Sequence, residues 1–248
     1  YTTLFRSVFA NDKGHTLAVA RSMDLYISDS PLLLSHPRGE KRTGEAGENS
    51  LSWTSKYGNL VVTAFHTSTA SDGMNEKGLA VHLLYLTDTE YPEIDAKTPK
   101  ISNAMWAQYI LDNFATVDEA LKGTKNLPLV ATKVNGKIWP IHLTMEDTTG
   151  DSAVIEFIQG KMHVYHGPQY RVMTNEPAYN IQLDNLKRYK AFGGTLPLPG
   201  DTDPLSRFVR VATFLKTLSA SKNEVESIAG VLSVIRTAMV PFGAIDTS

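Results

Sequence analysis

The hydrophobic pattern changes its period several times along the chain, and the order of these changes constrains the fold more than any other feature. The N-terminal part alternates as strands do, with Asn11-Asp12-Lys13-Gly14 as the hairpin turn between its first two strands. We expect polar loops at residues 36–50 and 67–77, where turn-forming residues are frequent. The strands predicted here are Leu4–Phe9, Thr16–Met23, Leu60–Phe65 and Gly78–Leu86.

Helical periodicity follows, and the two patterns then occur once more. Apolar residues recur at steps of three and four from Ala104 to Phe114, with Ser102 as N-cap, and a capping pattern begins a second helix at Thr116. Another helix begins at Asp203-Pro204, with a buried stripe of Phe208, Val211, Ala212 and Leu215, and a last stripe comprises Val225, Ile228, Leu232 and Ile235. An antiparallel meander is predicted from Trp139–Met145, Ala153–Ile158, His163–His166 and Arg171–Thr174.

Strands, helices, strands and helices in this order predict an α+β layered fold, in which helices cover antiparallel sheets. A length of 248 residues suits one large domain or two small ones. The formal net charge of −2 gives no indication of nucleic acid or an anionic membrane as partner. No apolar run reaches the length of a membrane span, so we expect a soluble protein.

Cysteine is absent from the sequence, which excludes disulfides, thiolate metal sites and thiol catalysis in the chain as written. The 7 histidines show no short-spaced pair typical of zinc sites. We therefore expect no metal site.

Pattern alone indicates four weak candidates for chemistry. Arg21 and Asp24 come at the end of a predicted strand, where a solvated ion pair is the ordinary interpretation. Asn75 and Asn175 lie at turns that such residues commonly cap. Arg207 is near the start of a helix, where a cation is unfavourable beside the positive end of the helix dipole, and this weakly indicates a specific partner.

Taken together, these segments resemble the choloylglycine hydrolases, and among them the penicillin V acylases of Gram-negative bacteria. Eight short motifs occur in the same order, from the first residues to about Gly243. They are Arg21-Ser22-Met23-Asp24, Ser52-Trp53-Thr54-Ser55-Lys56-Tyr57-Gly58, Asp72-Gly73-Met74-Asn75-Glu76-Lys77-Gly78-Leu79-Ala80, Trp106-Ala107-Gln108-Tyr109, Leu111 to Ala120, Gly150-Asp151-Ser152-Ala153, Met173-Thr174-Asn175 and Arg207-Phe208-Val209-Arg210.

The resemblance implies a four-layer αββα sandwich of the N-terminal-nucleophile (Ntn) hydrolases, and hydrolysis of a linear amide through an acyl-enzyme. The first residue of the mature chain attacks the carbonyl, and its own α-amine, with a pKa of about 8, takes the proton. Because this chemistry uses only protein groups, the resemblance implies no cofactor. Arg21 and Asp24 would flank this nucleophile, and Arg207 would organise the site electrostatically. Asn175 would donate to the oxyanion, and Tyr85 falls at the family's other oxyanion-side position.

The same resemblance predicts an acyl pocket lined by Met23, Leu25 and Phe65, with Leu25 where relatives often carry Trp. The expected substrates are phenoxymethylpenicillin, acyl-homoserine lactones and conjugated bile acids, in that order, because bile-selective members tend to carry Asn at the position of Tyr85. A periplasmic or secreted location, with a removed signal peptide, and a homo-oligomeric dimer or tetramer are further expectations from the family.

Two departures from the family pattern stand out. The family begins Cys-Thr, whereas this chain begins Tyr1-Thr2, and a phenol is a poor substitute for a thiol nucleophile. Three alternatives are open: Tyr1 replaces the Cys and leaves an inactive ligand-binding scaffold, a Cys precedes Tyr1, or Thr2 acts after removal of Tyr1. The chain also ends at Ser248, before the last strands of relatives, so we expect residues 1–248 to form one domain without those strands.

Overall fold

The computed structural model describes residues 4–10, 17–24, 28–65, 67–134 and 137–240. Their contacts divide the chain into two compact units. The larger unit comprises residues 28–83 and 89–167, and the smaller unit comprises residues 1–27, 84–88 and 168–248. The predicted hairpin turn at Asn11 to Gly14, Tyr1 and Leu25 lie outside the described residues.

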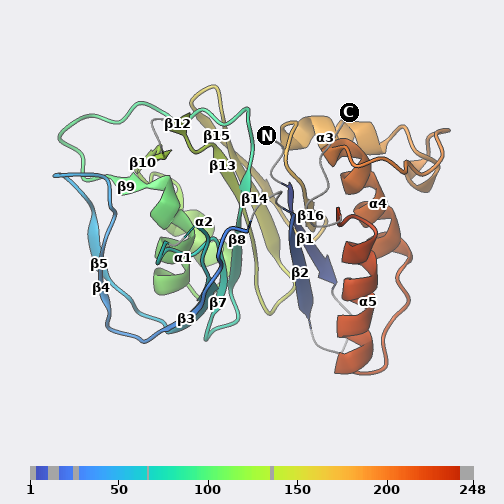
Figure 1. The fold of residues 1–248 in the computed structure, drawn as a ribbon, viewed down its shortest axis with the longest axis horizontal. Helices are drawn as coiled ribbons and strands as arrows, with labels where there is room; N and C mark the ends of the chain where they lie inside the picture. The colour runs from blue at the N-terminus through green and yellow to red at the C-terminus, as the bar shows by residue number, and fades with distance from the viewer. Residues whose placement is uncertain (1–3, 11–16, 25–27, 66, 135–136, 241–248) are drawn as a thin grey trace. The chain divides into compact units, whose positions relative to one another are not determined.

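A seven-stranded sheet dominates the larger unit, in the order β15-β14-β13-β8-β7-β6-β3 (Figure 1). β3, β6, β7 and β8 pair antiparallel in succession, and so do β13, β14 and β15. The strands are β3 (Leu33–His36), β6 (Asn59–Val62), β7 (Asp72–Asn75), β8 (Ala80–Tyr85), β13 (Ile141–Glu146), β14 (Ser152–Ile158) and β15 (Lys161–His166).

Helices α1 (Trp106–Asn113) and α2 (Val117–Thr124) cover one face of this sheet. A short 3₁₀ turn at Asn103–Met105 leads into α1, and Ser102 caps it by accepting from the Ala104 amide. Thr116 caps α2 by accepting from Glu119 N. Both predicted N-caps are confirmed. The core beneath the helices includes Leu83, Leu111, Leu143, Ile155 and Phe157.

The opposite face of the same sheet carries a group of buried polar side chains on its central strands. Because side chains alternate along a strand, His142, Thr144 and Glu146 of β13 leave the face opposite to Leu143. His142 Nδ1 lies 2.9 Å from Glu156 Oε1 on the paired strand β14, and neither side chain is exposed. Alternation in these strands therefore places buried polar side chains on the face opposite to the apolar core.

Short strand pairs accompany the large sheet. β4 (Lys41–Thr43) pairs with β5 (Ser52–Thr54), β9 (Ile101–Ser102) with β10 (Leu129–Val130), and β11 (Lys133–Val134) with β12 (Lys137–Ile138). The predicted loops at 36–50 and 67–77 are therefore wrong in part, because they contain β4 and β7. Whether such a short segment forms a strand depends on its backbone hydrogen bonds to a neighbouring segment. Residues that are typical of turns can make these bonds too.

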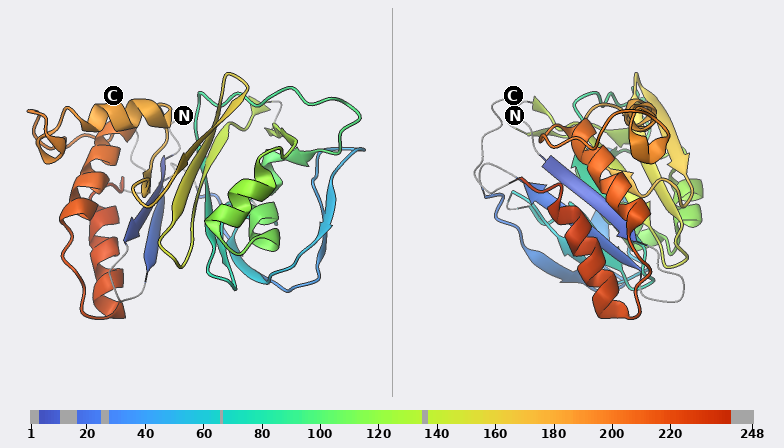
Figure 2. Two further views of the ribbon diagram at one scale, coloured as in Figure 1. Left: turned by 180° about the vertical axis from the view of Figure 1, so that it is seen from behind. Right: turned by 90° about the vertical axis from the view of Figure 1, so that its right-hand side faces the viewer.

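The smaller unit holds a three-stranded antiparallel sheet in the order β16-β1-β2. Its strands are β1 (Leu4–Ala10), β2 (Ala18–Asp24) and β16 (Val172–Met173). Its helices are α3 (Tyr179–Leu186), α4 (Pro204–Thr217) and α5 (Glu224–Arg236), with a 3₁₀ turn at Lys190–Phe192. Helices α4 and α5 pack against the sheet, as the turned view in Figure 2 shows. Asp203 caps α4 as predicted, by accepting from Leu205 N.

Two sequence predictions are wrong in this unit. Val225, Ile228 and Leu232 of α5 are exposed, whereas Ile235 is buried as predicted, together with Ser227, Val231 and Val234. Either stripe has helical spacing, so the pattern alone could not identify the packed one. The strand predicted at Arg171–Thr174 does not extend the β13–β15 meander, because β16 pairs with β1.

The α+β class is confirmed, and each unit contains an antiparallel sheet with helices on one face, as the predicted layers require. Among the described helices, none combines the length and apolar character needed to cross a bilayer.

Candidate active site

The smaller unit brings together three of the predicted site residues around the side-chain amide of Asn175. Its Nδ2 donates to the carbonyl oxygen of Tyr85 over 2.9 Å, and its Oδ1 accepts from Arg207 Nη2 over 3.3 Å. Asn175 and Arg207 are both fully buried. The two contacts fix the orientation of the amide, with its nitrogen toward Tyr85 and its oxygen toward Arg207.

Arg207 is a buried cation in the first turn of α4. Burial lowers the pKa of its guanidinium to about 10, while Asp24, Glu176 and Asp203 oppose this shift. Its Nε and Nη1 make no hydrogen bond with any described residue. The side chain therefore remains protonated near neutral pH and places a desolvated positive charge beside Asn175.

Strand β2 carries the predicted segment Arg21 to Asp24. Arg21 and Met23 alternate with Ser22 and Asp24, so the two pairs of side chains leave opposite faces of the strand. Ser22 Oγ donates to Asp24 Oδ2 over 3.0 Å. The electrostatic effect on Arg207 places Asp24 within the charge environment of the Asn175 amide.

Gln182 of α3 holds the segment around Asn175, although the sequence did not identify it. Its Nε2 donates to the carbonyl oxygens of Asn175 and Pro177, over 2.8 and 2.6 Å. Its Oε1 accepts from Thr174 Oγ1 over 2.7 Å. A polar residue on the buried face of a helix needs hydrogen-bond partners and so indicates a specific role. The sequence could not show this for Gln182, because the buried face of α3 is known only from the structure.

Other predicted residues are not brought into this group by any described contact. Phe65 belongs to the larger unit, where its ring packs edge-on against Trp139 at a centroid distance of 5.1 Å. Its φ of 55° is uncommon for a bulky residue. Met23 lies on β2 opposite Phe5. The acyl-pocket role of both residues stays a prediction.

Comparison with known proteins shows which family the chain belongs to. Residues 6–248 match the family described as linear amide C–N hydrolases, choloylglycine hydrolase family. The chain belongs to the choloylglycine hydrolase family.

Three relatives illustrate the match. Penicillin V acylase of Pectobacterium atrosepticum is 41% identical over 90% of this chain and 65% of its own length. The structure of penicillin V acylase from Agrobacterium tumefaciens, also 41% identical, has a TM-score of 0.88 over 98% of this chain and 74% of that one. Bile salt hydrolase/transferase of Clostridium perfringens is 30% identical over 84% of this chain and 70% of its own length.

Several choloylglycine hydrolase motifs outside the Asn175 group have structural roles here. Asn75 caps its turn, as its ordinary interpretation predicts: Oδ1 accepts from the Lys77 and Leu79 amides, and Nδ2 donates to the Leu111 and Phe114 carbonyls. Asp112 of α1 is buried and accepts hydrogen bonds from three side chains, those of Trp53, Asn59 and Gln108. Arg42 Nε lies 2.8 Å from Asp112 Oδ2.

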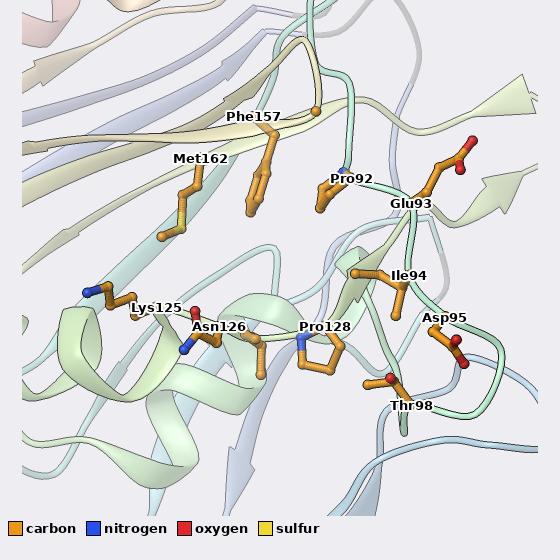
Figure 3. Close-up of a pocket in the computed structure, with 12 residues that line it drawn as sticks. Pro92, Glu93, Ile94, Asp95, Thr98, Lys125, Asn126, Pro128, Phe157 and Met162 are labelled. Atoms are coloured by element: carbon orange, nitrogen blue, oxygen red, sulfur yellow. The ribbon is translucent and has the colours of Figure 1, made fainter.

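A cavity of about 360 Å³ in the larger unit holds none of the predicted site residues (Figure 3). Phe157 of β14 and Met162 of β15 extend toward the segment that carries Asn126 and Pro128. Throughout the described part of the chain, no cluster of His, Asp and Glu side chains has the arrangement of a metal site.

Proposed function

We propose that this protein hydrolyses linear amides that carry a hydrophobic acyl group, by the N-terminal-nucleophile mechanism of its family. The observation that carries the proposal is the Asn175 amide held between the Tyr85 carbonyl and the buried Arg207 cation. Buried, fixed donors of this kind are suited to stabilise charge that develops on a carbonyl oxygen. Membership of the linear amide hydrolases gives this geometry its chemical context.

The proposed reaction has two stages. The residue at the nucleophile position attacks the amide carbonyl, its α-amine takes the proton, and the oxyanion receives a hydrogen bond from Asn175. The tetrahedral intermediate collapses as the leaving amine accepts a proton, which leaves an acyl-enzyme that water then hydrolyses. In this scheme Arg21 and Asp24 orient the nucleophile, and Arg207 keeps the amide of Asn175 in place.

The preferred substrate is proposed to be phenoxymethylpenicillin, followed by acyl-homoserine lactones and conjugated bile acids. Support comes from the two 41% relatives, which are named penicillin V acylases, whereas the relative named bile salt hydrolase/transferase is 30% identical. Tyr85 supports the same order, because bile-selective members tend to carry Asn there. The acyl group would contact Met23, Leu25 and Phe65.

A substrate comparison tests this proposal directly. The purified protein is incubated with phenoxymethylpenicillin or glycocholate at equal concentrations, and the released primary amine is quantified. We expect faster release from the penicillin and loss of both activities in Asn175→Ala. Faster release from glycocholate would reverse the substrate order, and equal turnover by Asn175→Ala would contradict the mechanism.

The identity of the nucleophile is tested by intact mass and N-terminal sequencing of the purified protein. A Cys in front of Tyr1, or in its place, would supply the thiol that the proposed mechanism uses. A confirmed Tyr1 with a free amine predicts negligible turnover, and a Tyr1→Cys variant is then expected to hydrolyse the penicillin. Failure of that variant to turn over any of the three substrate classes would contradict the proposal.

The homo-oligomer and the export expected from the family stay predictions. Light scattering of the eluted protein measures the first, and fractionation of the producing cells measures the second. A monomer, or a protein found only in the cytoplasm, would contradict the corresponding expectation.

A further inference from the structure

A second cavity, of about 490 Å³, lies entirely within the smaller unit. Its walls come from β16, α3, α4 and the 3₁₀ turn at Lys190–Phe192. This volume falls in the range of sites for small organic ligands, roughly 300–1,000 Å³. None of the residues predicted for catalysis lines it.

Most of the cavity wall is apolar. Tyr179 and Phe208 pack edge-on with their ring centroids 5.7 Å apart and are almost fully buried. Leu183 of α3 and Ala212 and Leu215 of α4 continue this surface. A hydrocarbon tail placed against this apolar surface would lose its contact with water.

The charged groups of the cavity are cationic, and Gln169 adds a neutral polar side chain. Arg171 and Lys216 line it, and neither Asp nor Glu is among its described lining residues. Lys216 Nζ donates to the Ala191 carbonyl over 2.8 Å and lies 5.1 Å from the centre of the Phe192 ring, so the ammonium is held at the cavity. Burial lowers the pKa of the Arg171 guanidinium, a sign that this cation is partly removed from water.

We propose that this cavity binds an amphiphilic carboxylate with a single hydrocarbon chain, with the tail against Tyr179 and Phe208 and the carboxylate at Arg171 and Lys216. Cation–carboxylate hydrogen bonds in a partly dry site are stronger than neutral ones, which favours an anion over an alcohol of equal length. The cavity of Figure 3 lacks this selectivity, because Glu93, Asp95 and Lys125 give it charges of both signs.

The proposal does not depend on amide hydrolysis. A hydrophobic carboxylate also belongs to the chemical class that the proposed reaction would release, yet the cavity contains no residue of the proposed mechanism. Binding and turnover are therefore separate measurements, and the Asn175→Ala variant is expected to retain this binding when its turnover is lost.

Calorimetric titration with decanoate below its micelle concentration tests the site, with decanol and decylamine as tail-matched controls. We expect decanoate to bind the purified protein more tightly than decanol, and decylamine to bind least. Lys216→Glu should weaken decanoate binding about tenfold or more, because it replaces an attractive charge by a repulsive one. Lys222→Glu makes the same charge change at an exposed position that does not line the cavity, and should bind as the parent does.

A second variant fills the cavity instead of changing its charge. Ala212→Phe should abolish the decanoate signal while a thermal melt shows a folded protein. The proposal is overturned if decanoate does not bind the parent, or if Lys216→Glu and folded Ala212→Phe both bind it as the parent does. Binding of decanol as tight as that of decanoate would also overturn it, because the cations would then have no part in recognition.

Discussion

Asn175 is the residue at which the local contacts and the proposed chemistry coincide. A turn asparagine needs only local backbone partners, whereas this one reaches Tyr85, 90 positions away, and Arg207, 32 positions away. The amide is thus held by tertiary contacts at both ends. The interpretation of Asn175 as a simple turn cap, which the sequence alone favours, does not account for these two contacts.

Replacing Asn175 by Ala should lower kcat by roughly 100- to 1,000-fold, the usual effect of losing one oxyanion donor. The fold should survive, because the substitution removes side-chain contacts and no backbone pairing. Asn113→Ala is the matched control, since within the described residues its side chain donates to the Tyr109 carbonyl of its own helix and makes no other hydrogen bond. Steady-state kinetics on phenoxymethylpenicillin measure kcat for both variants. An unchanged kcat in Asn175→Ala would contradict its role as an oxyanion donor.

Asp24 provides a second test at this scale. Its negative charge offsets part of the effect that burial has on the pKa of Arg207. Asp24→Ala removes this charge and should lower kcat by roughly 100-fold, because the reacting groups would be misplaced. Asp118→Ala, at an exposed position on α2, is the control. Full activity of Asp24→Ala would return this residue to the role of a solvated charge at the end of a strand.

At the scale of elements, α3 determines where the Thr174–Pro177 segment lies. This helix was not predicted, and its Gln182 makes three hydrogen bonds to that segment. The strands and helices with strong periodicity were found from the sequence, but a short helix whose role is to hold a turn has no such pattern. The site therefore depends on an element that periodicity does not reveal.

Gln182→Leu should destabilise the fold by about 1–3 kcal/mol, because it leaves buried carbonyl groups without a donor. We expect a lower melting temperature together with a lower kcat, since the Asn175 backbone would lose its support. Ile181→Ala, at an exposed neighbour on the same helix, is the control for a general effect on α3. A lower melting temperature with unchanged kcat would show that Gln182 does not position Asn175.

The buried polar face of the seven-stranded sheet gives a prediction on pH. His82 Nδ1 lies 2.9 Å from Asp72 Oδ1, and Nε2 lies 3.1 Å from Glu146 Oε2. Burial opposes protonation of His82, but the two carboxylates outweigh it and raise the pKa of the imidazole to about 10. The other titratable side chains described on this face are those of His142 and Glu156 and, on β15, those of Lys161, His163 and Tyr165.

Because the folded pKa of His82 exceeds the ordinary value of 6.5, its contribution to stability is complete below pH 6.5 and is lost as the pH rises toward about 10. His82→Gln should lower the free energy of unfolding by roughly 3–5 kcal/mol near neutral pH, because the buried carboxylate of Glu146 and the partly buried one of Asp72 lose their cation. Above pH 6.5, the stability of the variant should also fall less with rising pH than that of the parent.

Urea denaturation between pH 6 and pH 9 measures both effects. The control is His163→Gln, at an exposed position on β15, which should change neither the stability nor its pH dependence. A His82→Gln variant whose stability falls with pH as steeply as that of the parent would show that another group is responsible.

At the scale of the whole molecule, the path of the chain links the two units. It crosses from one to the other at residues 27–28, 83–84, 88–89 and 167–168, and β8 contributes residues to both. A division that runs through a strand is unlike a boundary between independent domains, which falls in an exposed linker. The expected single domain is therefore compatible with two contact-defined units.

Scanning calorimetry tests this expectation. We expect one unfolding transition in which the calorimetric and van't Hoff enthalpies agree, because neither unit can complete β8 without the other. The Gln182→Leu variant, which alters the smaller unit alone, should shift that whole transition to lower temperature. Two separate transitions, of which the variant moves only one, would contradict the prediction of one domain.

The sequence by itself determined the α+β class, the strongly periodic elements, the caps Ser102, Thr116 and Asp203, and the family through its ordered motifs. These depend on local chemistry and residue order, which a linear sequence contains. Only the tertiary structure decided which face of α5 is buried, that β16 pairs with β1, and that Gln182 supports Asn175. Each of these depends on which distant part of the chain a segment packs against. The packing partner is selected because it lowers the exposed apolar area and the number of unpaired polar groups of the whole fold, not of one segment.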